Sequence, residues 1–237
     1  MKKSNLSLII SGLAILLSAS ILQSCEKEEA LVVTEEDAAD IIAASFGSQT
    51  GGIAHEVAIN TEYISEETNE LECGSSRTII KSFVKSEGVN TGNITYNWDL
   101  SRNCSSEVTY LNWVGNFNGS FETPRLSGST SGTRNWLITG FESENNFLTF
   151  NGSINRNGSH NSKVRQRRSF STEISYEFSE VVVSKGTHEI QSGTGTVQIS
   201  IEGSNGGSKS FSGNITFNGN GSVTVVLNNE TFQIITN

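Results

Sequence analysis

The feature that most constrains this chain is a two-residue period of apolar side chains, which runs from residue 76 to the end. In one stretch the apolar and polar positions alternate without a break: Ile94, Tyr96, Trp98 and Leu100 against Asn93, Thr95, Asn97 and Asp99. Successive side chains of a β-strand point to opposite faces, so each such strand has one apolar and one polar face. This pattern is typical of antiparallel sheets that bury one face and leave the other in water.

Short segments rich in Asn, Gly and Ser separate the alternating runs, for example residues 86–92, 203–208 and 218–221. These residue types supply the backbone conformations that tight hairpins need. The chain has 23 Gly and a single Pro, and charged residues make up only 17%. We therefore predict a mainly β fold, an antiparallel meander of about ten strands. A twisted sheet of this size rarely stays flat, so we expect it to curl into a roll, a half-open barrel or a sandwich.

Two short helical patterns precede the strands. Thr34 can cap a helix whose first turn holds three acidic residues, and Gly47 can end it. The apolar residues between them recur at helical spacing and form one stripe: Ala38, Ile41, Ile42 and Phe46. A weaker pattern runs from Ile53 to Ile64. We expect the stripe to pack on the β region, because its acidic polar face is unlike that of helices that lie on membranes.

The first 24 residues have the layout of a secretory signal peptide, with a basic start and an uncharged run over residues 6–22. Directly after this run, Leu22-Gln23-Ser24-Cys25 resembles the lipobox of bacterial lipoproteins. That resemblance implies that Cys25 is acylated and becomes the first residue of the mature chain. We therefore divide the chain into a signal peptide, an acidic tether, a helical region and a β domain: residues 1–24, 25–33, 34–72 and 73–237.

The acidic residues are concentrated behind this cysteine. Residues 25–72 hold thirteen acidic residues and one basic residue, whereas residues 73–237 hold twelve acidic and thirteen basic residues. The run Glu26-Lys27-Glu28-Glu29 resembles the surface-export signal of Bacteroidota lipoproteins, which implies a protein held to the outer membrane by its lipid and facing the cell exterior. An acidic segment is repelled by an anionic membrane and holds the domain away from it. Nothing in this charge distribution indicates a nucleic acid as partner.

The other two cysteines, Cys73 and Cys104, are expected to form a disulfide bond. Disulfides persist in exported proteins. The two residues lie at equal distances from the turn-like segment 86–92, so in a hairpin they would face each other at its open end. Closing this loop should contribute about 3–4 kcal/mol in the chain-entropy model. A metal-binding or redox pair would have a closer spacing.

The sequence contains no pattern that indicates catalysis or a cofactor. His55, His160 and His188 have no ligand-like spacing, and they build no zinc signature with the cysteines. The glycine-rich segments 128–132 and 203–210 lack residues or a following helix that a nucleophile elbow or a phosphate loop requires. We therefore expect a protein without enzymatic activity and without a cofactor.

A basic segment at residues 163–168 is the first candidate binding site. If it is extended, Lys163, Arg165 and Arg167 point to one side, where three cations could hold sulfate, phosphate or an acidic sugar. The alternative is a charged stretch that discourages edge-to-edge pairing, which is common in β proteins.

An aromatic set is the second candidate: Trp98, Trp113 and Trp136. Exposed indole rings could form a platform that stacks on sugar rings. Buried, they belong to the core, which is where Trp is mostly found. Trp98 shares its face with Ile94 and Leu100, and this favours the core.

Three functions are consistent with these patterns. The first is a non-enzymatic surface module that binds a glycan or an outer-membrane protein partner. The second is a carrier that holds an apolar ligand in the hollow of the curled sheet, with the helices as a lid. The third is a purely structural envelope lipoprotein. An apolar cavity would favour the carrier, whereas an open face with suitable side chains would favour the binding module.

Overall fold

The computed structural model describes residues 32–67, 71–105, 108–164, 168–204 and 206–236. The predictions for the signal peptide, for Cys25 and for residues 25–31 of the tether therefore lie outside the described residues. Val32–Asn237 make up one unit of the chain, and the description below concerns this unit.

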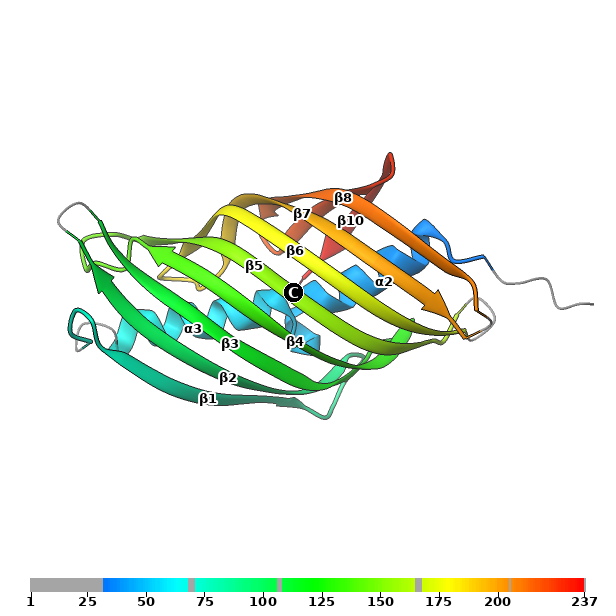
Figure 1. The fold of residues 1–237 in the computed structure, drawn as a ribbon, viewed down its shortest axis with the longest axis horizontal. Helices are drawn as coiled ribbons and strands as arrows, with labels where there is room; N and C mark the ends of the chain where they lie inside the picture. The colour runs from blue at the N-terminus through cyan, green and yellow to red at the C-terminus, as the bar shows by residue number, and fades with distance from the viewer. Residues whose placement is uncertain (1–31, 68–70, 106–107, 165–167, 205, 237) are drawn as a thin grey trace, which may run out of the picture. The chain divides into compact units, whose positions relative to one another are not determined.

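A single antiparallel sheet of ten strands dominates the unit, and each strand pairs with the next along the sequence (Figure 1). The strands are β1 (Ser76–Lys85), β2 (Thr91–Cys104), β3 (Thr109–Glu122), β4 (Leu126–Thr139), β5 (Phe147–Ser162), β6 (Ser169–Ser184), β7 (Ile190–Gly203), β8 (Ser208–Gly219), β9 (Ser222–Leu227) and β10 (Glu230–Ile235). The outermost strands, β1 and β10, are not paired with each other, so the sheet is not closed. The predicted antiparallel meander is confirmed. The sheet is curled and is not closed into a barrel.

Two helices lie against one face of the curled sheet (Figure 1). Helix α2 (Glu35–Phe46) starts at Thr34, whose hydroxyl accepts from the backbone N–H of Asp37, and the Asp37 carboxylate accepts from the backbone of Thr34 in return. Helix α3 (Ile53–Glu67) follows after the short 3-10 turn η1 (Ser48–Thr50). Gly51 allows the sharp bend between them, because its φ of 68° is a left-handed value that favours glycine.

The apolar stripe of α2 packs on the sheet, as the sequence predicts. Ala38, Ile41, Ile42 and Phe46 are all at most 1% exposed. The Phe46 ring meets Tyr176 and Phe178 of β6 edge to face, with ring centroids 5.6 and 6.3 Å apart. We call the sheet face that the helices cover the inner face, and the opposite one the outer face.

Glycines on the inner face make room for large rings on neighbouring strands. Gly115 of β3 is paired with Trp98 of β2, and Gly132 of β4 is paired with Phe117 of β3. A Cβ atom on Gly132 would come within 2.7 Å of the Phe117 ring. The alternation of glycine and aromatic residues therefore sets how closely the core can pack.

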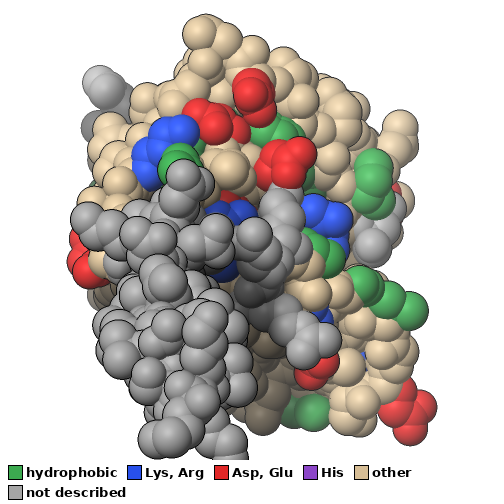
Figure 2. Space-filling view, turned by 90° about the vertical axis from the view of Figure 1, so that its right-hand side faces the viewer, with side chains coloured by type: hydrophobic (Ala, Val, Ile, Leu, Met, Phe, Trp, Pro, Cys, Tyr) green, Lys and Arg blue, Asp and Glu red, His purple; other side chains and the backbone are tan. Residues whose placement is uncertain are grey.

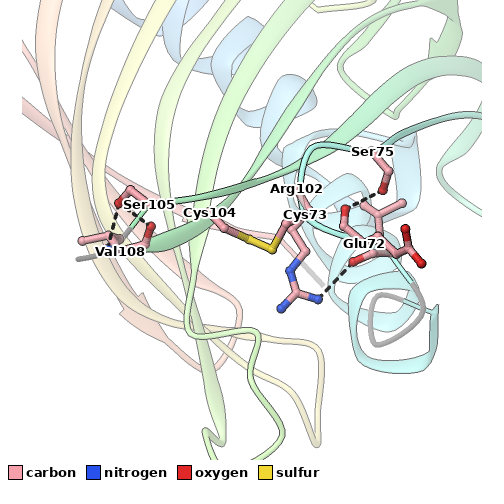
Figure 3. The surroundings of a disulfide bond; sticks show 8 residues. Glu72, Cys73, Ser75, Arg102, Cys104, Ser105 and Val108 are labelled. Carbon is pink, nitrogen blue, oxygen red and sulfur yellow. Dashed lines mark hydrogen bonds between the residues drawn. A yellow bond between two sulfur atoms is a disulfide. The ribbon is translucent and has the colours of Figure 1, made fainter.

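The disulfide bond between Cys73 and Cys104 closes the open end of the first hairpin (Figure 3). Ser76 pairs with Ser101, so the same register extended by three residues places the two cysteines opposite each other. Their Cα atoms are 5.7 Å apart. The pairing predicted from the spacing is confirmed.

Candidate functional site

The outer face of the sheet is exposed and carries an ordered array of short polar side chains. Because strands in register place paired residues side by side, the outward residues of β2–β8 form rows that cross the sheet. Three adjacent rows, which we call the polar rows, are Asn93, Ser120, Ser129, Ser159, Ser171, Glu202 and Ser208; Thr95, Asn118, Ser131, Asn157, Glu173, Ser200 and Ser210; and Asn97, Asn116, Thr133, Asn155, Ser175, Gln198 and Ser212. Only Glu202 and Glu173 are charged in them.

An open groove of about 930 Å³ lies over the polar rows between β3 and β8. Hydroxyl and amide groups line it, together with the carboxylates of Glu173 and Glu202, with Ile201, and with Lys209, which is paired with Glu35. Some of these groups already bond across strands: the hydroxyls of Ser200 and Ser210 lie 2.9 Å apart. Hydroxyls and amides both donate and accept, and short side chains lose little conformational freedom when a ligand orders them. The groove is therefore suited to a neutral ligand that offers many hydrogen-bonding groups.

The predicted cationic strip is described only in part. Strand β5 ends at Ser162, so Lys163 lies just beyond the end of β5. The Lys163 ammonium donates to the Glu122 carboxylate at 2.5 Å and to the Thr123 carbonyl at 2.8 Å. Arg165 and Arg167 lie outside the described residues, so the strip as an anion site stays a prediction.

The three tryptophans belong to the core. Trp98, Trp113 and Trp136 are at most 1% exposed, so they offer no exposed platform to a ligand. Trp98 meets Trp113 edge to face with centroids 5.2 Å apart, and Trp113 meets Tyr63 of α3 in the same way. The structure therefore supports the interpretation that the tryptophans belong to the core, which the position of Trp98 on one face with Ile94 and Leu100 already favoured.

The hollow of the sheet is occupied by the helices. Besides the α2 stripe, Ile53, Val57 and Ile64 of α3 are buried in it. A cleft of about 260 Å³ lies beside the helices, lined by Phe46, Phe217 and residues of the β6–β7 connection. This is small for the ligand pocket of a carrier, since typical pockets occupy about 300–1,000 Å³.

A cluster of buried charges lies beneath the sheet, and the sequence reasoning missed it. Glu56 of α3 forms an ion pair with Arg134 of β4, and both side chains are at most 3% exposed. The Arg134 guanidinium also lies over the Phe117 ring, 4.4 Å from its centroid. Arg156 of β5 is 5% exposed. The sequence did contain a signal for this cluster, because Arg134 and Arg156 stand at positions of their strands where the alternation places apolar residues.

The helix ends account for the signs of two of these charges, those of Arg156 and Glu56. Arg156 donates to the carbonyl of Ser45 at 3.2 Å, in the last turn of α2, and to the hydroxyl of Thr130 at 2.6 Å. Glu56 lies in the first turn of α3. The C-terminal end of a helix dipole favours a cation and the N-terminal end favours an anion. Both buried charges thus match the dipole end they approach, and they fix the α2–α3 bend on the sheet.

Burial shifts the pKa values of these groups. It raises the pKa of Glu56, while the neighbouring Arg134 charge acts against that rise. It lowers the pKa of Arg134 and of Arg156. His160, whose Nε2 lies 2.9 Å from the Thr172 hydroxyl, is 4% exposed. Burial, with Arg156 adding to it, lowers the pKa of His160 to about 4.

Ion pairs hold the first turns of α2 at one end of the sheet. Three acidic residues of the helix each meet a basic residue near a different hairpin end: Asp40 with Arg125 at 2.8 Å, Asp37 with Arg168 at 3.3 Å, and Glu35 with Lys209 at 3.0 Å. Figure 2 faces this end, where blue Lys and Arg side chains lie among red Asp and Glu side chains. The charges of α2 are therefore used for docking on the sheet.

Within the described ranges, no group of three or more His, Cys, Asp and Glu side chains could hold a metal ion. In the same part of the chain, neither helix has the length and hydropathy needed to cross a membrane. Comparison of the chain with protein-family models, with curated proteins and with solved structures finds no match.

Proposed function

We propose that this protein is a lipid-anchored, non-enzymatic module of the bacterial outer membrane, and that the outer face of its sheet binds a neutral, hydroxyl-rich glycan at the cell exterior. The polar rows carry this proposal. They offer hydroxyl and amide groups on seven adjacent strands, with two carboxylates among them.

The geometry of the rows suits a polymer of sugars. Neighbouring strands are spaced by about 4.7–4.9 Å, and outward residues along one strand by twice the rise of about 3.3 Å. Donors and acceptors therefore repeat at short intervals in two directions. A glycan chain presents hydroxyls at comparable intervals, and each can exchange a bond with water for a bond with the sheet. Individual bonds of this kind are weak, so binding would depend on many of them along the groove.

The anchor rests on the residues before the described part. The lipobox-like sequence that ends at Cys25 and the acidic run behind it support attachment by acyl chains. Each buried methylene of such a chain contributes about 0.8 kcal/mol to membrane binding. A domain held in this way needs no apolar surface of its own, which agrees with the polar rows on its outer face.

Affinity electrophoresis tests the glycan site. The full-length protein in detergent is run through gels that contain laminarin, mannan, dextran or, as an acidic comparison, alginate. We expect at least one neutral polysaccharide to retard it. The variant Ser131→Lys/Asn157→Lys places two long cations in the groove and should weaken that retardation at least tenfold.

The matched control is Asn145→Lys/Asn146→Lys, which adds the same charge in the exposed β4–β5 connection. It should migrate with the affinity of the unmodified protein. Equal weakening by both variants, or no retardation by any neutral polysaccharide, would contradict the proposal. The anchor has its own test: intact-mass analysis should show an acylated Cys25 at the amino terminus, and Cys25→Ser should release the protein from membranes.

A further inference from the structure

The free edge of strand β1 carries an inference beyond the glycan site. β1 is ten residues long and pairs with β2 alone. Along its other side, the described backbone of residues 78–85 makes no further hydrogen bond to another stretch of backbone. An exposed edge of this kind presents N–H and C=O groups that can pair with another strand.

The opposite edge is less accessible to a partner. β10 has six residues, and the residue that follows it, Thr236, is tied on both sides. Its carbonyl accepts from the backbone of Ser48 at 2.7 Å, and its own N–H donates to Gly221 at 2.8 Å. The longer, unattached edge is therefore the one at β1.

Two outward side chains of β1 differ from the polar rows that the strand extends, whereas Ser82 between them resembles the rows. Ile80 and Val84 are 69% and 67% exposed, and each is paired with an Asn of β2. Apolar side chains in such positions gain contacts when a strand with apolar residues is added beside them. The outer side of the edge thus favours apolar residues in a partner.

The inward side of the same strand carries basic residues at a spacing of four: Arg77, Lys81 and Lys85. The described contacts of Lys81 and Lys85 are with neutral groups, namely the Tyr63 ring and the Gln49 side chain. A second copy of β1 would oppose this positive charge with its own. A segment with acidic residues on its inward side would instead form cross-strand pairs of opposite charge.

We propose that the β1 edge docks an extended segment of a partner protein in which acidic and apolar residues alternate, and that this segment becomes an eleventh strand of the sheet. The acidic side chains lie beside Lys81 and Lys85, and the apolar ones lie beside Ile80 and Val84. Backbone hydrogen bonds provide the attachment, and the charge sets which segment is accepted.

Labelled decapeptides of alternating Glu and Val, or of alternating Lys and Val, test this proposal by fluorescence anisotropy with the full-length protein in detergent. We expect the Glu peptide to bind at least tenfold more tightly than the Lys peptide. Hydrogen exchange should slow in residues 76–85 on binding and stay unchanged in residues 230–235. Replacing two central valines of the Glu peptide by proline should abolish binding, because proline removes backbone donors and does not fit a paired strand.

The variant Lys81→Glu/Lys85→Glu should reverse the preference between the two peptides. The control Lys163→Glu/Lys185→Glu changes the net charge by the same amount elsewhere and should preserve it. Retardation by polysaccharide should be unaffected by either variant, which keeps this test separate from that of the glycan site. Equal binding of both peptides, protection outside β1, or protection of β1 that grows with protein concentration in the absence of peptide would each overturn the proposal.

Discussion

Removing Arg134 gives the sharpest test of how the helices are held on the sheet. The substitution Arg134→Leu places an apolar side chain of moderate size in the core but removes the ion-pair partner of Glu56. The Glu56 side chain is 3% exposed, so water cannot replace the lost partner without opening the structure. Removing one partner of a buried ion pair costs about 3–5 kcal/mol, and we expect a loss of this size in the free energy of unfolding.

The pH dependence of this loss follows from the remaining carboxyl group. Burial already raises the pKa of Glu56, and Arg134 opposes that rise. Without Arg134, the pKa of Glu56 in the folded state rises further above the value in the unfolded chain, so the variant takes up a proton on folding. Its stability is then greatest below the unfolded pKa and falls as the pH rises through the folded pKa. The cost of Arg134→Leu should therefore be smaller in acid than at pH 7.

Urea unfolding followed by tryptophan fluorescence measures these effects, because Trp98, Trp113 and Trp136 become exposed on unfolding. The double variant Glu56→Leu/Arg134→Leu should recover most of the stability, since an apolar replacement of a buried pair is often neutral or better. Arg125→Leu removes an exposed ion pair and should cost at most about 1 kcal/mol. A double variant as unstable as the single one, or a single variant that loses less than the Arg125 control, would refute the reasoning.

Three further perturbations have definite outcomes. Replacing Cys73 and Cys104 by Ser should lower the free energy of unfolding by about 3–4 kcal/mol in the chain-entropy model, measured by urea titration against the oxidised protein; an unchanged midpoint would contradict a closed bond. His160 stays neutral in the fold, because burial lowers its pKa to about 4, while the unfolded chain takes up a proton near pH 6.5. Stability should therefore fall by roughly 3 kcal/mol as the pH drops from 7 to 4, and His160→Gln should flatten that part of the pH profile. Gly132→Val places its Cβ in a steric clash with the backbone oxygen of Asn155 and 2.7 Å from the Phe117 ring, so it should cost at least about 1–3 kcal/mol in the same titration. Gly186→Val, in open surroundings, should cost nearly nothing.

Much of the fold was within reach of the sequence, because its signals are local. The two-residue period predicted the antiparallel meander, and Thr34 and Gly47 predicted the bounds of the first helix. The positions of Cys73 and Cys104 about one turn predicted their disulfide bond. Each of these inferences depends on spacing along the chain, which the structure preserves.

The candidate site depends on the register between paired strands, which cannot be read from the sequence. In the sequence, Ser131 and Asn157 are two of many small polar residues. Only the pairing of β4 with β5 places them side by side. The buried charges were hidden for a different reason. Arg134 and Arg156 lie in the apolar phase of their strands, but their partners in α2 and α3 are reached through tertiary contacts that no local pattern encodes.

The central claim is that the outer face of the sheet is the binding surface, and the side-chain amides of asparagine report on it directly. Asn118 and Asn157 lie in the polar rows, whereas Asn60 of α3 is 0% exposed. Proton–nitrogen NMR spectra are recorded while laminariheptaose, maltoheptaose or mannoheptaose is added to the labelled protein. The amide resonances of Asn118 and Asn157 should shift in a saturable way with one of these sugars, while that of Asn60 stays in place. Shifts confined to the cleft beside Phe46 and Phe217, or no shift at high sugar concentration, would contradict the account.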